Sequence, residues 1–247
     1  MYIPPKFTKR ELDVIPLLVA GATRREIARH LKLSEETIKK YVRSLLTKFD
    51  ATTLRDCIFD ITDYYEQFIK GSHKFFVPHL KTTLHLFANY QDCEIVSEYD
   101  ILAIKSGVQS VSELYHSDGH LPDVTVNGEK IDAIHEITGD LYRWNFPREL
   151  KPFETQGIVS KVRFNGAFGK NEERHFNNIA DPTGHMSLGV VFHTDTLPNE
   201  VVYGIRQGID DLSEISKLEH STNNEFRIEV PRPGYQKRHY IKWIWQK

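Results

Sequence analysis

Basic side chains gather in one stretch of this 247-residue sequence, between Arg24 and Lys48. Eight lysines and arginines stand there against three acidic residues. A local excess of positive charge attracts phosphate groups, and phosphate contacts supply most of the sequence-independent affinity of proteins for nucleic acid. These residue types therefore favour recognition of a polyanion. Whether the charges can act together depends on the elements that carry them.

Residues 34–49 have the spacing of an amphipathic helix. The apolar residues recur at intervals of four, three and four positions, which places them on one buried face: Ile38, Val42, Leu45 and Phe49. The opposite face then carries Glu36, Lys40, Arg43 and Thr47. Ser34 is a favourable N-cap, because its hydroxyl can accept a hydrogen bond from a free amide of the first turn. We expect this helix to begin at about Ser34.

A shorter helix is predicted directly before it, over residues 24–31. Ile27, Ala28 and Leu31 fall on one side of it, and the small side chain of Ala28 lets two helices cross closely. Lys32 and Leu33 form the corner between the helices. Two short helices that meet in this way make a helix-turn-helix, whose second helix enters the major groove of DNA.

Several short motifs follow one another in order around these helices. They are the T-x-x-E from Thr8 to Glu11, the turn at Gly21, the E-I-A from Glu26 to Ala28 and the L-S-E-x-T-I-K from Leu33 to Lys39. With these motifs, residues 7–68 closely resemble the LuxR/NarL (GerE-type) DNA-binding domain; region 4 of sigma factors has a similar helix-turn-helix. The family commonly carries this domain at the C-terminus, whereas it is N-terminal here. We therefore do not transfer the family's phosphoreceiver or acyl-lactone switching to this chain.

The resemblance also implies which side chains meet DNA. Lys39, Lys40 and Arg43 take the places from which the family's recognition helix reaches bases and nearby phosphates. Lys40 and Arg43 lie at the centre of the outward face, so they are the candidates for reading bases, and Arg43 is suited to a bidentate contact with guanine. The other candidates flank this face or lie at the entrance of the preceding helix, and would contact the DNA backbone: Thr37, Lys39, Tyr41, Thr47, Arg24 and Arg25.

Two further helices complete the predicted four-helix domain over residues 1–70. The capping box of Thr8 and Glu11 predicts a helix from Thr8 that Pro16 should bend or split. Its buried residues are expected to be Leu12, Ile15, Leu18 and Val19. After a turn at Asp50, a fourth helix is predicted from about Thr53 to Lys70, with a long stripe of Leu54, Ile58, Ile61, Tyr65 and Phe68. In the resembling family this helix dimerises the domain; docking on the C-terminal domain is the alternative.

The spacing of the apolar residues changes after residue 92 from a helical to a strand-like pattern. A mainly-β domain is therefore predicted over residues 93–247. Short β-branched and aromatic runs alternate with turns such as Asn127-Gly128, which favours an antiparallel β-sandwich or barrel. The predicted strands are Glu94–Val96, Tyr99–Lys105, Val124–Val126, Lys130–Ile137, Leu141–Phe146, Gly157–Phe164, Ser187–His193, Glu225–Val230 and His239–Trp245. One helix is expected at most, over Tyr203–Leu218. Residues 71–92 are too apolar for a free linker, so we expect an ordered connector.

Histidines are the candidate metal ligands of the second half. His116, Asp118 and His120 could begin a site, but the Asp-Gly pair indicates a turn and neither a third ligand nor a metalloprotease spacing accompanies them. His175, His185 and His193 could meet across strands, although a satisfied or exposed histidine is the expectation for each. We therefore expect no metal, no cofactor and no enzyme. Outward aromatic residues, with Arg143, Arg163 or Lys242, could line a ligand or partner surface.

Composition bounds the class of protein. Residues 1–70 hold 13 basic residues against 10 acidic ones, whereas the remainder holds 19 against 24, so the positive charge belongs to the first part. The two cysteines, Cys57 and Cys93, are too few for a disulfide framework, which fits a reducing compartment. No apolar run is long enough for a signal peptide or a membrane span. We expect a cytoplasmic protein without a membrane partner.

The sequence thus predicts a DNA-binding transcriptional regulator, controlled by its C-terminal domain through an unknown ligand or protein partner. A homodimer formed by the helix at residues 53–70 would place two recognition helices on half-sites of a roughly palindromic operator. Two alternatives stay open: an adaptor whose helix-turn-helix binds protein, and an enzyme whose β domain is catalytic and only located on DNA.

Overall fold

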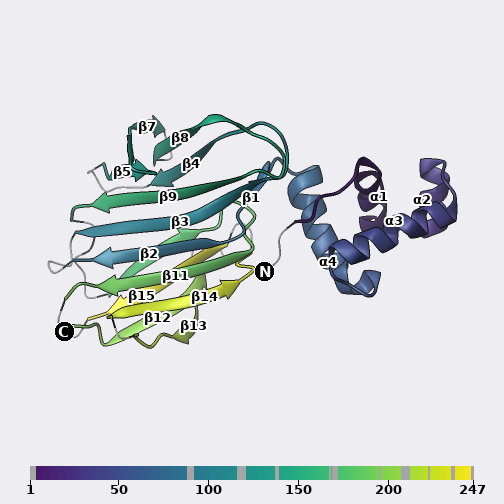
Figure 1. The fold of residues 1–247 in the computed structure, drawn as a ribbon. Coiled ribbons are helices and arrows are strands. Elements are labelled where there is room, and N and C mark those ends of the chain that lie inside the picture. Colours follow the sequence, from purple (N-terminus) through teal and green to yellow (C-terminus); the bar gives the residue numbers. More distant parts are fainter. Residues whose placement is uncertain are drawn as a thin grey trace. The chain divides into compact units, whose positions relative to one another are not determined.

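The computed structural model describes residues 4–87, 92–115, 121–136, 139–166, 168, 172–194, 196–206, 212–221, 223–234 and 237–245. The chain divides into two compact units (Figure 1). Ile3–Lys74 form a helical unit, and Phe75–Lys247 form a second unit that we call the β unit. Among the described residues, no helix is long and apolar enough to cross a membrane.

The helical unit contains the four predicted α-helices. They are α1 (Lys9–Val19), α2 (Arg24–Leu31), α3 (Glu35–Lys48) and α4 (Leu54–Tyr64), and a π-helical turn, Tyr65–Lys70, continues α4. Thr8, Thr23 and Ser34 cap the first three helices, each accepting from a backbone amide of the first turn. Such N-caps satisfy backbone donors that the helix itself leaves free, which is why the helices begin there.

Two local expectations met different outcomes. The predicted turn after α3 is present, and Asp50 takes the left-handed conformation there with a φ of 51°. Pro16 lies inside α1, yet the helix continues through it to Val19 without a split. Pro16 has no amide hydrogen to donate, but Pro16 O still accepts from Ala20 N at 3.0 Å, which closes the last turn.

The β unit contains three sheets, and most of their strand pairs are antiparallel (Figure 1). The eight-stranded sheet has the order β14-β11-β2-β3-β9-β5-β6, and β1 also pairs with β3. Its strands are β1 (Phe75–Phe76), β2 (Leu80–Leu86), β3 (Cys93–Ala103), β5 (Asp123–Val126), β6 (Glu129–Ile131), β9 (Thr155–Phe164), β11 (His185–Phe192) and β14 (Glu225–Pro231). None of the described sheets closes on itself, so the barrel alternative is wrong.

Two smaller sheets accompany the large one. The four-stranded sheet has the order β10-β15-β12-β13, and the three-stranded sheet has the order β4-β8-β7. Their strands are β4 (Val108–Tyr115), β7 (Ala133–Glu136), β8 (Gly139–Leu150), β10 (Glu172–Asn178), β12 (Glu200–Arg206), β13 (Leu212–Lys217) and β15 (Arg238–Ile244). The strands β1, β2, β4, β10, β12 and β13 were not among those predicted from the sequence.

The helix expected over Tyr203–Leu218 is wrong. Residues 200–206 and 212–217 form the antiparallel strands β12 and β13 instead. The β-branched pair Val201-Val202 lies directly before this segment in β12, and the segment itself contains Gly204, which disfavours a helix. The ordered connector was expected at residues 71–92, and its described part includes β2, which lies between β11 and β3 near the middle of the large sheet.

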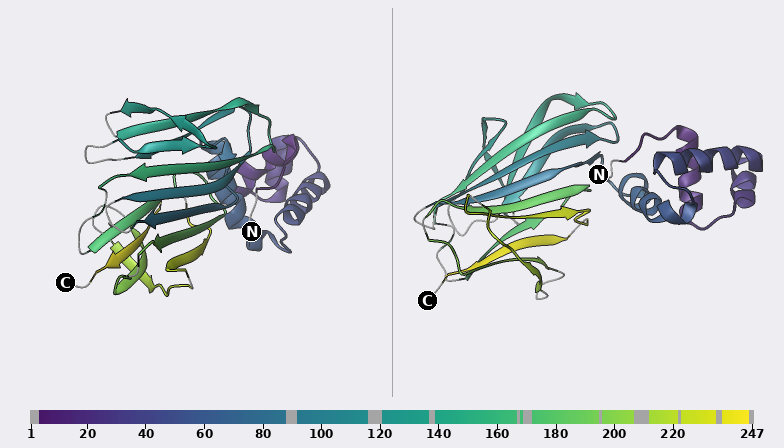
Figure 2. Two further views of the ribbon diagram at one scale, coloured as in Figure 1. Left: turned by 60° about the vertical axis from the view of Figure 1, so that its left-hand side comes forward. Right: turned by 60° about the horizontal axis from the view of Figure 1, so that its bottom comes forward.

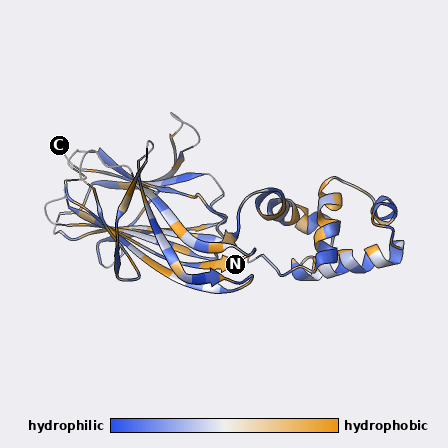
Figure 3. Cartoon of the chain, turned by 90° about the horizontal axis from the view of Figure 1, so that it is seen from above, coloured by the Kyte–Doolittle hydropathy of each residue, from blue (hydrophilic) through white to orange (hydrophobic). Residues whose placement is uncertain are grey.

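All three sheets contribute buried residues to one hydrophobic core, and the layers of strands are seen in Figure 2. Phe192 of β11 contacts Trp243 of β15 edge to face, with ring centroids 6.0 Å apart. Between the same two sheets, Asn177 Nδ2 donates to Thr82 Oγ1 at 2.9 Å. Hydrophilic and hydrophobic residues alternate along many strands (Figure 3). In β9, for example, Ile158, Ser160 and Val162 are buried and the residues between them are exposed.

Gly204 allows a close approach between β12, β13 and the ring of Tyr240. A Cβ atom added at Gly204 would lie 2.6 Å from Ser213 O and would collide with the Tyr240 ring, which is 1% exposed and cannot move away. We expect Gly204→Ala to lower the free energy of unfolding of the β unit by on the order of 1–3 kcal/mol. Urea unfolding followed by tryptophan fluorescence measures this, because all three tryptophans lie in the β unit.

Gly157→Ala is the matched control for this prediction. Gly157 is also a strand glycine, and a Cβ atom there would meet only Asp100 Oδ1, at an ordinary 3.4 Å. An equal loss of stability in both variants would mean that the loss reflects glycine chemistry in strands rather than the approach of Tyr240.

Candidate nucleic-acid interface

The corner between α2 and α3 is built by the backbone of residues 28–33. Lys32 ends α2 in the left-handed conformation with a φ of 54°, and Leu33 N donates to Ala28 O at 2.9 Å. Ile27 and Ala28 are buried at the crossing, where Ala28 is 4% exposed. Ala28 therefore lies at the helix crossing, as predicted from the small size of its side chain.

The burial of α3 fixes which of its faces is outward. Ile38, Val42 and Leu45 are buried, and Phe49 packs half-buried against Phe7 with ring centroids 5.7 Å apart. The predicted N-cap is confirmed, since Ser34 Oγ accepts from Thr37 N at 3.0 Å. The stripe therefore faces the core of the helical unit and turns the opposite side of α3 toward solvent.

The outward side carries the candidate contact residues. Lys40, Arg43 and Thr47 of α3 are exposed, as are Arg24 and Arg25 in the first turn of α2, whereas Thr37, Lys39 and Tyr41 are half-buried. Lys39 Nζ lies 3.7 Å from Glu36 Oε2. Within the described parts of the chain, neither Lys40 nor Arg43 has an ion-pair partner. These two side chains can therefore approach a polyanion without first breaking an internal contact.

A buried glutamate in α1 holds the C-terminal part of α3. Glu11 is 2% exposed, and its carboxylate accepts from Thr8 N at 2.6 Å, Ser44 Oγ at 2.6 Å and Lys48 Nζ at 2.5 Å. Burial alone would raise the pKa of Glu11, but the hydrogen bonds from Lys48, Ser44 and Thr8 overcome this and lower the pKa to about 2. The ionised carboxylate therefore joins α1 to α3.

Sequence reasoning assigned Glu11 only to the capping box of α1. The capping hydrogen bonds are indeed present, but Ser44 and Lys48 lie more than thirty positions away, and no local signal connects them to Glu11. Lys48 is one of the eight basic residues counted in the stretch, yet its side chain is 26% exposed and paired with Glu11. Lys48 therefore holds α3 against α1 through Glu11, rather than contacting phosphate.

The histidine candidates of the β unit are placed differently from one another. His116, Asp118 and His120 lie outside the described residues. His175 is in β10, where burial lowers its pKa to about 4. His185 and His193 do not meet each other: the ring of His185 stacks on His79, and His193 Nε2 lies 3.0 Å from His85 Nδ1. The three histidines therefore do not form one cluster.

Most of the large aromatic residues in the strands of the β unit are core residues. Tyr142, Trp144, Phe192, Tyr240 and Trp243 are buried, and Phe164 and Trp245 are half-buried. Of the three basic residues that could accompany them, Arg143 and Arg163 are exposed, whereas Lys242 is 8% exposed and pairs with Glu214. The proposed aromatic ligand surface is therefore not formed by these residues.

Comparison with known proteins identifies the helical unit. Residues 5–59 match the family model described as GerE, bacterial regulatory proteins, luxR family. No curated protein matches the chain. The match covers α1, α2 and α3 and extends into α4. Every candidate contact residue lies within the matched range.

Solved structures similar to this chain resemble it only distantly. An M1 zinc metallopeptidase mutant from Deinococcus radiodurans matches with a TM-score of 0.40 at 12% identity. The match covers 70% of this chain and 43% of the metallopeptidase chain. A putative protease from Parabacteroides distasonis has a TM-score of 0.43 at 7% identity, with 70% and 40% covered. Native yeast LTA4 hydrolase has a TM-score of 0.40 at 15% identity, with 68% and 29% covered. The chain thus spans less than half of the length of each of these proteins.

The helix-turn-helix geometry, the outward basic face of α3 and the family match agree on the same residues. Such a domain implies DNA binding. Residues 5–59 are therefore a helix-turn-helix domain of the LuxR family of bacterial regulatory proteins.

Proposed function

We propose that this protein is a cytoplasmic, DNA-binding transcriptional regulator whose β unit controls the DNA affinity of its helical unit. The observation that carries the proposal is the outward face of α3, where Lys40 and Arg43 are exposed and lack ion-pair partners among the described residues. Basic side chains in such a position give both phosphate attraction and access to base edges. The proposal assigns no catalytic role to the β unit.

The roles of the side chains follow from their places on α2 and α3. Arg43 reads a base by two parallel hydrogen bonds, and Lys40 reaches a neighbouring base or phosphate. The remaining candidates contact the DNA backbone and fix the register of the helix: Thr37, Lys39, Tyr41, Thr47, Arg24 and Arg25. Lys39 and Tyr41 are half-buried beside the exposed face, a position that suits nearby phosphates better than base edges.

The experiment that tests the proposal uses the full chain. Fluorescence anisotropy on DNA from upstream of its own gene, and on pooled genomic fragments, is measured across a salt series. We expect the logarithm of the association constant to fall linearly with the logarithm of salt concentration, and one DNA segment to bind more tightly than the pool. Weak binding with little salt dependence on every fragment would contradict the proposal and favour a protein-binding adaptor.

We further propose that α4 joins two copies of the chain. One side of the helical segment at residues 54–70 is buried in the unit, through Cys57, Ile61, Tyr64 and Phe68, whereas Phe59 is 79% exposed. A phenyl ring in water favours burial against an apolar partner. Two copies joined through α4 would place two recognition helices on half-sites of a roughly palindromic operator about one turn of DNA apart.

Phe59→Glu is expected to break this dimer. A charged side chain buried at the centre of a helix–helix contact has no partner there, so its desolvation opposes association. Sedimentation velocity should report a monomer at concentrations where the unchanged protein is a dimer, and affinity for a palindromic site should fall at least tenfold. Ile215→Glu is the matched control, because Ile215 is an exposed apolar residue of the β unit. Identical sedimentation of all three proteins would contradict dimerisation through Phe59 of α4.

A further inference from the structure

We propose that His79, His185 and Glu229 bind a divalent transition-metal ion such as Zn²⁺ on the large sheet of the β unit. Each of the three side chains offers one ligand atom, and these atoms lie within 4.8 Å of one another. The rings of His79 and His185 are stacked, with centroids 5.1 Å apart. No other described group of histidine, cysteine and acidic residues comes together in this way.

The distances suit a small ion placed between the ligands. His185 Nε2 lies 3.6 Å from Glu229 Oε2, which is too long for a hydrogen bond. Two ligand atoms on a tetrahedral Zn²⁺ ion, with bonds of about 2.0–2.1 Å, lie roughly 3.3 Å apart. Small side-chain rotations therefore bring this pair into coordination range. All three ligand atoms lie within 4.8 Å of one another, and a rotation of the half-buried His79 ring would bring its ligand atom to the same ion.

The backbone brings the two histidines together from distant parts of the sequence. Val77 N donates to Pro182 O and Gly184 N donates to Val77 O, both at 2.9 Å. These hydrogen bonds lie directly before His79 and His185, at the starts of the parallel strands β2 and β11. The third ligand follows from the antiparallel pairing of β11 with β14, in which Glu229 is opposite Ser187. The fold of the sheet therefore holds the ligand set in place.

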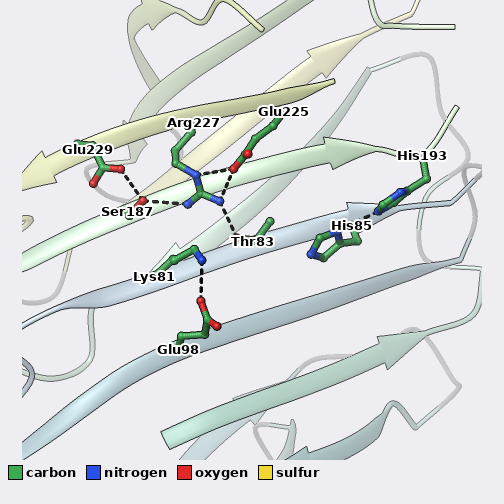
Figure 4. Close-up of polar contacts among 9 residues, drawn as sticks. All are labelled: Lys81, Thr83, His85, Glu98, Ser187, His193, Glu225, Arg227 and Glu229. Atoms are coloured by element: carbon green, nitrogen blue, oxygen red, sulfur yellow. Dashed lines mark hydrogen bonds and ion pairs between the residues drawn. The ribbon is translucent and has the colours of Figure 1, made fainter. Parts of the chain in front are cut away.

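The carboxylate is also oriented by neighbouring side chains, as ligands of metal sites usually are. Ser187 Oγ donates to Glu229 Oε1 at 2.7 Å, which leaves Oε2 directed at His185. Arg227 in turn donates to Ser187 Oγ at 2.9 Å and is itself held by Glu225 at 2.5 Å (Figure 4). Glu229 thus presents one oxygen to the network and the other to the site.

The chemistry of the three side chains indicates which ions would fit. His185 would coordinate through Nε2, the ring atom that faces Glu229. Two imidazoles and one carboxylate suit Zn²⁺ and related borderline ions, and leave a coordination position for water or for an external ligand.

The test is a titration of untagged full-length protein with Co²⁺, whose visible absorption reports its coordination, followed by displacement with Zn²⁺. We expect one Co²⁺ ion per chain, with an absorption spectrum of nitrogen and oxygen ligands. His79→Gln/His185→Gln should abolish the spectrum, and Glu229→Gln, which keeps an oxygen for Ser187, should weaken binding at least tenfold. His85→Gln/His193→Gln is the matched control, because it removes the stacked histidine pair at the other end of the same two strands.

Each outcome decides the assignment. Retained Co²⁺ binding in the control and its loss in His79→Gln/His185→Gln would support the site. Absence of binding by the unchanged protein would overturn the proposal, and so would equal binding by His79→Gln/His185→Gln, which would place the ion elsewhere. Circular dichroism of every variant confirms that the fold is retained. The result is independent of DNA binding, so failure of this proposal leaves the assignment of α3 untouched.

Discussion

Reversing the charges of Lys40 and Arg43 together is expected to weaken DNA binding by roughly 100-fold or more, which corresponds to about 2.7 kcal/mol. A bidentate contact of an arginine with guanine contributes about 1–3 kcal/mol of discrimination, and the two introduced carboxylates repel phosphate. The slope of affinity against salt should also become shallower by about one for each phosphate that the variant no longer neutralises. Fluorescence anisotropy of Lys40→Glu/Arg43→Glu across a salt series measures both effects.

The control must change the net charge by the same amount elsewhere in the helical unit. Arg10→Glu/Arg55→Glu does so, because both arginines are exposed and lie on α1 and α4 rather than on α3. We expect at most a few-fold reduction of affinity for this variant. If the two double variants weakened binding equally, the outward face of α3 would have no special role, and binding would reflect the net charge of the unit.

Local signals explain why the helical unit could be predicted from the sequence. A cap and the residue three positions later meet within one turn, so Ser34 and Thr37 indicate the start of α3 without any tertiary information. The stripe of Ile38, Val42 and Leu45 likewise depends only on the helical period. Residues whose partners lie within one or two turns can therefore be placed by sequence reasoning alone.

The strand order of the β unit could not be predicted, because the residues of a strand do not indicate which strand it will pair with. β2 pairs with β11, more than a hundred positions away, and the strand's own residues carry no mark of that partner. The exposed edge strand β13 has only partial alternation, with Leu212 and Ile215 outward, so a helix was the wrong interpretation of this segment. Strand partners and edges follow from the global topology rather than from local propensity.

The histidines illustrate the same limit at the level of a site. The sequence suggested that His185 could meet His175 or His193, whereas its neighbour is His79. His79 precedes β2, and only the parallel register of β2 with β11 brings it beside His185. Glu11 is the corresponding case in the helical unit, since its cap is local but its contact with Lys48 is not.

Replacing Glu11 by glutamine is expected to destabilise the helical unit by about 3 kcal/mol at neutral pH. The folded unit holds the pKa of Glu11 at about 2, below its ordinary value of 4.5, so the ionised form binds its partners more strongly in the folded state. Glutamine keeps the shape of the side chain but lacks the charge that faces Lys48. Urea unfolding followed by far-ultraviolet circular dichroism reports the helical unit, while tryptophan fluorescence follows the β unit separately.

The sign of the pH dependence separates this mechanism from a change of packing. The pKa of Glu11 is lowered in the folded state, so its contribution is complete above about pH 4.5 and is lost as the pH falls through about 2. The stability difference between the unchanged protein and Glu11→Gln should therefore shrink in acid. Glu26→Gln is the matched control, because Glu26 forms the same capping box with Thr23 on the exposed surface of α2. A difference that stayed constant down to low pH would mean that Glu11 acts through packing rather than through its charge.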